Sequence, residues 1–190
     1  MRKVLVPVLF VAAASAAAVL MLSSMGPGAT AQAPEGEQLV PAAAPGVPIQ
    51  QPINFSHKIH AGDVGLDCLY CHVGADDGAV ATIPAVETCM GCHKMVGLGR
   101  PEIDKLAGYW ERQEPIPWIK VNDLVDHARF DHHRHVAADV QCQTCHGPVE
   151  TMDQVYLQQD LLMGFCVQCH KQNLNTPNTP TSLDCATCHR

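Results

Sequence analysis

The sequence is poor in the side chains that fill an ordinary protein core. Of its 190 residues only 5% are aromatic, whereas glycine and proline each occur 14 times. A domain of this size normally buries one continuous apolar core. This composition makes a poor conventional core, so we expect apolar mass from a source other than the side chains.

An excess of positive charge is also missing. The chain carries 12 Lys and Arg against 19 Asp and Glu, and its formal net charge at pH 7 is −7. Binding of nucleic acid needs a basic surface that neutralises phosphates. The charge balance therefore excludes nucleic acid as a partner. It bears on the solubility of the protein and on its encounter with partner molecules rather than on its fold.

No cysteine lies outside one repeated motif. All ten cysteines belong to five copies of Cys-x-x-Cys-His, so none is left for an iron–sulfur cluster, a disulfide or a lipid anchor. The ten cysteines are Cys68, Cys71, Cys89, Cys92, Cys142, Cys145, Cys166, Cys169, Cys185 and Cys188.

The motif has the spacing of covalent c-type haem attachment, in which two thiols bond to the porphyrin and the next histidine is the proximal iron ligand. A zinc site would combine two such knuckles to reach four ligands, and five knuckles leave one unpaired. A redox dithiol would not need a histidine at the same offset five times. We therefore predict five covalently bound haem c groups. The predicted proximal ligands are His72, His93, His146, His170 and His189.

Five macrocycles would supply the apolar mass that the side chains lack. The predicted fold class is accordingly mostly irregular with short α-helices, the polypeptide wrapping around five haems with long loops and little sheet. A transmembrane helix at the N-terminus is expected in addition.

The remaining six histidines include a second repeat. Phe-x-His-x-x-His begins at Phe55 and again at Phe130, and each copy precedes a haem motif. Such a repeat indicates a repeated structural unit. Histidines three residues apart on a helical turn lie on one side of it, so they can point at two irons and clamp neighbouring haems. An isolated histidine is more often a surface residue, but the repetition favours ligation. The predicted distal ligands are His57, His60, His132 and His135.

The first histidine of each pair is expected to serve the haem that follows it, and the second to reach across to another haem. The fifth distal ligand is left open between His127 and Met152, with Met163 as a weaker candidate. His133 is adjacent to His132 and is the expected spare. The choice matters because thioether ligation raises a haem potential relative to bis-histidine ligation.

The N-terminus has the pattern of a membrane anchor. Arg2 and Lys3 precede an apolar run from Val4 to Leu22. At about 1.5 Å per residue this run approaches the hydrocarbon thickness of about 30 Å. Basic residues before the run keep the N-terminus cytoplasmic. We expect a single-pass protein of the bacterial inner membrane, with its haem domain on the periplasmic side, where haem c is attached.

A cleaved signal peptide is the competing interpretation of the same segment. Ala31-Gln32-Ala33 resembles a small-x-small cleavage site. Against cleavage, Pro34 would follow the cut, and the apolar run is longer than usual for a signal peptide.

The predicted organisation has five parts. An anchor (1–23) is followed by a linker rich in proline, glycine and alanine (24–53), a dihaem module (54–95), a haem-free connecting segment (96–126) and a trihaem module (127–190).

Two longer stretches resemble a known family. Pro115 to His135 contains Pro-Ile-Pro-Trp and Asp-His-Ala-Arg-Phe-Asp-His-His-Arg-His. It leads into Cys-Gln-Thr-Cys-His-Gly-Pro-Val-Glu-Thr-Met, which ends at Met152, and then Leu-Met-Gly-Phe-Cys, which ends at Cys166. Within the wider class III multihaem cytochromes c, residues 53–190 are similar to the pentahaem cytochrome subunit of bacterial alternative complex III. The haem subunit of a related membrane quinone reductase complex shares much of this motif set but typically carries an additional haem.

The resemblance implies an electron-transfer subunit rather than an enzyme in its own right. It implies three kinds of partner: an iron–sulfur and molybdopterin-like subunit, polytopic quinol-site subunits and a monohaem cytochrome c. The subunit would relay electrons from quinol oxidation to a periplasmic carrier or a terminal oxidase. Alternatives are a free-standing periplasmic multihaem carrier, a small membrane-anchored quinol dehydrogenase, and a haem enzyme, which would need an open iron position.

Overall fold

The computed structural model describes residues 44–177 and 181–189. The chain divides into two units, Met1–Leu39 and Val40–Arg190, and all described residues belong to the second. The predicted anchor (1–23), the proposed cleavage site and most of the linker lie outside the described residues. Within the described residues, no helix has both the length and the apolar character needed to cross a membrane.

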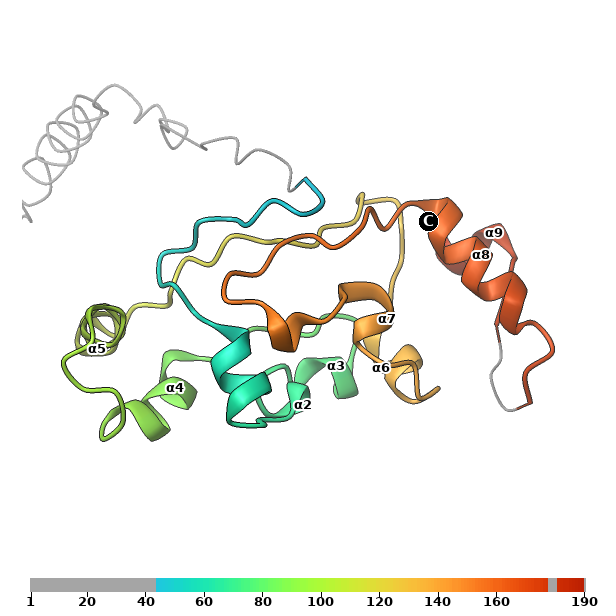
Figure 1. The fold of residues 1–190 in the computed structure, drawn as a ribbon. Coiled ribbons are helices and arrows are strands. Elements are labelled where there is room, and N and C mark those ends of the chain that lie inside the picture. The colour runs from blue at the N-terminus through green and yellow to red at the C-terminus, as the bar shows by residue number, and fades with distance from the viewer. Residues whose placement is uncertain (1–43, 178–180, 190) are drawn as a thin grey trace, which may run out of the picture. The chain divides into compact units, whose positions relative to one another are not determined.

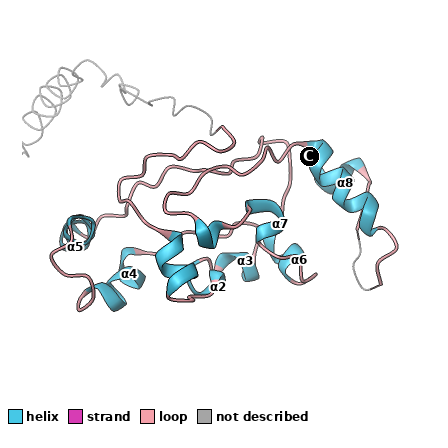
Figure 2. Cartoon of the chain, viewed as in Figure 1, coloured by secondary structure: helices cyan, strands magenta, loops and turns pink. Residues whose placement is uncertain are grey.

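Short helices joined by long irregular segments make up this unit (Figures 1 and 2). Sheet structure in the described residues is limited to two isolated antiparallel bridges, Pro48 with Tyr156 and Ala128 with His189. The expectation of short helices, long loops and little sheet is thus confirmed. The elements in chain order are η1 (Lys58–Asp63), α2 (Cys68–Cys71), α3 (Gly74–Asp77), α4 (Val86–His93), α5 (Pro101–Arg112), α6 (His132–Val136), α7 (Gln143–His146), η2 (Val149–Thr151), α8 (Met163–Asn173) and α9 (Cys185–Cys188).

Each Cys-x-x-Cys-His motif includes a helical turn, in α2, α4, α7, α8 or α9. Two of these turns have an aspartate cap. Asp67 accepts a hydrogen bond from the amide of Leu69, and Asp184 accepts one from the amide of Ala186. Such caps satisfy amides that lack a partner within the helix. A helical turn brings cysteines three residues apart to one side, as two bonds to one macrocycle require.

Helix α5 is the longest described helix, with 12 residues, and it lies in the haem-free segment. The haem motifs predict helices elsewhere, and no expectation from the sequence covers this one. Its local signals are nevertheless clear, with Pro101 at the start, acidic residues in the first turn and Arg112 in the last. Gln113 ends the helix in the left-handed conformation, with a φ of 54°.

A small apolar cluster forms where α4 and α5 meet. Its buried members are Ile53, Met90, Leu106 and Ile116, and Trp118 packs against them. This cluster supports the end of the unit that carries the second haem motif. Elsewhere the described residues contain little buried apolar surface, and no large side chain is fully buried.

Two joints connect the predicted dihaem and trihaem modules. One is between α3 and α6, and the other is between η1 and η2. At the second joint the amide of Lys58 donates to the carbonyl of Met152 over 2.9 Å. Gly62 is required there, because a Cβ at this position would overlap the carbonyl oxygen of Glu150. The two modules therefore pack on one another.

Candidate haem sites

Each of the five motif histidines faces one other histidine. We number the candidate haem sites 1 to 5 in the chain order of their motifs. The ring-centroid separations are 6.5 Å for His72 and His57 (site 1), 6.0 Å for His93 and His60 (site 2), 6.3 Å for His146 and His132 (site 3), 6.2 Å for His170 and His135 (site 4), and 5.6 Å for His189 and His127 (site 5).

The separations at sites 1 to 4 suit two imidazoles that share one metal ion, and the 5.6 Å at site 5 is shorter. A metal–imidazole nitrogen bond is about 2 Å and a ring centre lies about 1.1 Å beyond its nitrogen, which gives about 6.3 Å between centroids. Three different stretches of chain supply the facing rings, at His57 and His60, at His127, and at His132 and His135. The pairing has the form expected if the second histidine of each Phe-x-His-x-x-His turn reaches across to another haem. His60 faces the motif of site 2 rather than that of site 1.

Backbone carbonyls hold most of these rings in orientation. A ring whose Nδ1 donates to a carbonyl keeps the Nε2 lone pair free for a metal, as is usual for metal-bound histidine. The carbonyl acceptors and distances are Thr82 for His72 (2.8 Å), Val96 for His93 (2.9 Å), Ser182 for His170 (2.9 Å), Ser56 for His60 (2.8 Å), Ala79 for His132 (2.8 Å), Asp131 for His135 (2.8 Å) and, more weakly, His127 for His189 (3.4 Å).

The phenylalanine of the repeated motif packs against both histidines that follow it. The Phe55 ring stacks on His60 at 4.3 Å and meets the edge of His57 at 4.9 Å. Phe130 repeats this arrangement, at 4.5 Å from His135 and 4.7 Å from His132. The motif thus contains its own support, since one aromatic ring sets the directions of two imidazoles.

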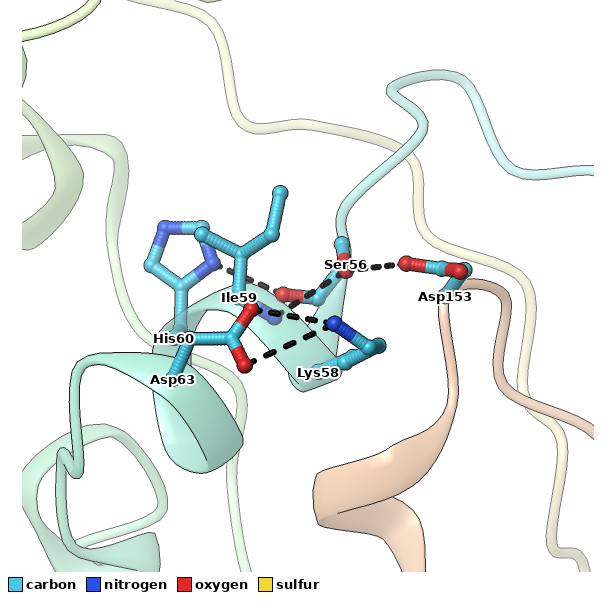
Figure 3. Close-up of polar contacts among 6 residues, drawn as sticks. All are labelled: Ser56, Lys58, Ile59, His60, Asp63 and Asp153. Carbon is cyan, nitrogen blue, oxygen red and sulfur yellow. Dashed lines mark hydrogen bonds and ion pairs between the residues drawn. The ribbon is translucent and has the colours of Figure 1, made fainter.

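The turn that carries His60 is also held by polar contacts (Figure 3). The Ser56 hydroxyl accepts a hydrogen bond from the Ile59 amide over 3.2 Å and donates one to the Asp153 carboxylate over 2.9 Å. Lys58 and Asp63 form an exposed ion pair at 3.1 Å. Asp153 follows η2, so a segment next to site 3 supports the turn that serves sites 1 and 2. Neither Ser56 nor Asp153 is among the residues predicted from the sequence; a serine just before a helical turn is the signal that points to Ser56.

Burial favours the neutral form of two of these rings. Burial first, and the nearby His72 and His60 to a smaller extent, together lower the pKa of His57 to about 4. Burial also lowers the pKa of His146, with smaller effects from His132 and His72. The neutral ring is the form that binds a metal. The Nδ1 atom of His57 is buried without a hydrogen-bond partner, which leaves a polar atom of site 1 unsatisfied.

The arrangement suits haem better than a bare metal ion. No cluster of three or more His, Cys, Asp or Glu side chains able to hold a metal occurs among the described residues. Haem needs only two protein ligands, because the porphyrin supplies the others. Large apolar side chains beside the motifs are exposed, including Tyr70, Val73, Leu162 and Met163. The ten cysteines form no disulfide. The residues therefore fit a large apolar group that is held by two thioethers and two imidazoles.

The other sequence candidates lie outside the five ring pairs. Met152 is only 3% exposed, and its carbonyl accepts a hydrogen bond from the Lys58 amide. Met163 is 68% exposed. His133 is exposed, and its Nδ1 donates to the carbonyl of Asp76. His127, and not Met152, faces a motif histidine, and this geometry favours His127 for the fifth distal position, which the sequence leaves open between the two.

Two comparisons with known proteins point to multihaem cytochromes c. Residues 128–190 match the family described as cytochrome c7 and related cytochrome c. Over 162 residues the chain is 28% identical to a protein of Nitratidesulfovibrio vulgaris (strain Hildenborough) named menaquinone reductase, multiheme cytochrome c subunit. That match covers 74% of this chain and 77% of the relative. The chain is therefore similar to multihaem cytochromes c over most of its length.

Proposed function

We propose that this chain is a pentahaem cytochrome c that relays electrons. The observation that carries the proposal is the set of five ring pairs, each joining one Cys-x-x-Cys-His motif to one further histidine. Bound haem c would supply reversible one-electron chemistry at each site. The cysteines would fix its edge, and the paired imidazoles would hold its iron from both faces.

The polypeptide contributes orientation rather than catalysis. Carbonyl-bound Nδ1 atoms fix the ring planes, and the two Phe-x-His-x-x-His turns hold neighbouring sites at short range. Catalysis at haem needs an open iron position, and the pairing leaves every site with two imidazoles. We therefore propose an electron-transfer subunit and not an enzyme in its own right.

We place this subunit in a membrane complex that exchanges electrons with the quinone pool. The relative from Nitratidesulfovibrio vulgaris is named as a subunit of a menaquinone reductase, which supports a link to quinone. Five motifs and the resemblance of residues 53–190 favour the quinol-oxidising alternative complex III. Its partners would be an iron–sulfur and molybdopterin-like subunit, polytopic quinol-site subunits and a monohaem cytochrome c. The N-terminal segment would anchor it in the inner membrane, with the haems on the periplasmic side.

A second candidate is the haem subunit of a quinone-reducing complex, in which electrons run through the haems toward the quinone. The named relative is the observation that favours it. Both candidates need the same relay, and they differ in the direction of electron flow and in the partner subunits.

Purification of the intact complex tests this proposal. Native membranes would be solubilised in mild detergent, and the haem-stained band containing this chain would be analysed for subunits and for reaction with quinols and quinones. We expect co-purification with polytopic and molybdopterin-like subunits, together with quinol-dependent haem reduction. Quinone reduction by the same preparation would favour the second candidate. Recovery of the chain alone with five haems would contradict membership of a complex and indicate a free-standing carrier.

A further inference from the structure

Shared turns make two pairs of sites neighbours. The turn η1 carries His60 and is preceded directly by His57, so sites 1 and 2 share one helical turn. Helix α6 carries His132 and His135 in the same way, so it joins sites 3 and 4. Residues three apart on a turn project to the same side, which keeps each pair of sites close.

Sites 4 and 5 are joined through the backbone between their motifs. Nδ1 of His170, the proximal ring of site 4, donates over 2.9 Å to the carbonyl of Ser182, which lies just before the motif of site 5. Within the motif of site 5, the carbonyl of Cys188 accepts a hydrogen bond from the Arg129 amide over 2.7 Å. The segment that leads into α6 therefore touches site 5 as well.

Sites 1 and 3 meet where α6 rests on α3. Helix α3 directly follows the motif of site 1. The carbonyl of Ala79 accepts from Nδ1 of His132, the distal ring of site 3, over 2.8 Å. The His133 amide donates to the carbonyl of Gly78 over 3.0 Å, and the His133 ring donates to the carbonyl of Asp76. The distal ring of site 3 is thus fixed on the chain that leaves site 1.

Further observations agree with this placement. The pKa of the Cys68 thiol is raised by burial and, next, by the Cys142 thiol of site 3. Within this unit Figure 1 shows α4 and α5 at one end and α8 and α9 at the other, with α2, α3 and α6 between them. The sites therefore follow one another in space in an order that differs from their order in the sequence.

We propose that the five sites form a single file in the order 2, 1, 3, 4, 5, that electrons cross between the modules at the α3–α6 joint, and that His133 is the positioning residue of this joint. The inference rests on the proposed relay function. In the crossing step one electron leaves reduced site 1, which becomes oxidised, and enters oxidised site 3, which becomes reduced. No bond forms or breaks, and no proton moves.

His133 acts through its neighbours. Its ring faces no motif histidine, yet it supplies one of the side-chain hydrogen bonds from α6 to the chain after site 1. The Asp76 carbonyl lies in the last turn of α3, where carbonyls lack helical partners. Without the ring, α6 would shift on α3, and the ligand planes at site 3, now 8° apart, would tilt.

The test compares three holoprotein variants. His133→Ala removes the donor, and His133→Asn keeps an N–H group near the Nδ1 position. Arg134→Ala is the matched control, because this side chain is 82% exposed on the same helix. Ferric electron paramagnetic resonance spectra report the ligand planes. Absorbance relaxation after photo-injection of fewer than one electron per molecule reports redistribution among the haems.

We expect His133→Ala to alter the site 3 spectrum and to slow the relaxation by roughly threefold to tenfold, because small displacements act steeply on rates. His133→Asn should restore both readouts, and Arg134→Ala should change neither. If His133→Ala behaves like Arg134→Ala, the inference fails. If His133→Ala loses haem and His133→Asn retains it, the result supports a positioning role for His133. If both variants lose haem, that role is overturned. Fewer than five haems in the unsubstituted protein would instead sink the proposed function.

Discussion

Replacing His60 with alanine is expected to open site 2 and to leave site 1 six-coordinate, although His60 lies closer in sequence to the motif of site 1. The physical reason is that the His60 ring faces His93 at 6.0 Å, whereas His72 faces His57. The reduced variant should therefore bind carbon monoxide at one haem. The measurement is a carbon monoxide difference spectrum, with haem content determined on the same sample.

The ligand planes identify which haem has been opened. At site 2 they cross at 65°, and at site 1 they are nearly parallel at 7°. Crossed imidazole planes give a strongly anisotropic ferric low-spin signal, and parallel planes give a rhombic one. His60→Ala should remove the anisotropic signal, and the matched variant His57→Ala should remove a rhombic one. Loss of a rhombic signal in His60→Ala and of the anisotropic signal in His57→Ala would contradict the assignment of His60 to site 2.

The second large effect separates His127 from Met152 as the fifth distal ligand. His127→Ala should open site 5 to carbon monoxide, because His127 faces His189 at 5.6 Å. Met152→Ala should leave all five haems six-coordinate and their potentials unchanged. It should instead destabilise the protein by about 2–5 kcal/mol, because it empties a buried position.

Met152→Leu is the control for that experiment. It conserves volume and should cost less than about 1.5 kcal/mol. Potentiometric titration and thermal unfolding of the three variants provide the two readouts. A changed haem potential in Met152→Leu, or unaltered coordination in His127→Ala, would return the fifth position to the methionine.

The sequence predicted the haem-attachment motifs and four of the five facing histidines because these depend on local patterns. Covalent attachment needs two cysteines and a histidine at fixed offsets. The Phe-x-His-x-x-His turn contains its own support, since Phe55 packs on both rings that follow it. The low aromatic content likewise predicted a chain with little core of its own. Ligation at each site remains a prediction that the experiments above test.

Contacts between distant residues could not be predicted in this way. His127 meets its partner through a bridge between Ala128 and His189, and no local repeat marks it. The carbonyl acceptors are backbone atoms, so residue type does not reveal them. Helix α5 is stabilised by packing of Leu106 against other segments, and tertiary packing supplies most helical stability. The spatial order of the sites depends on the α3–α6 joint, which sequence spacing does not encode.

The most direct measurement of the central claim is the haem content and carbon monoxide reactivity of the unsubstituted protein, purified from membranes in its reduced form. The account predicts five covalently bound haems per chain and no carbon monoxide binding, because two imidazoles close each iron. Fewer than five haems, or carbon monoxide bound at any of them in the intact protein, would contradict it.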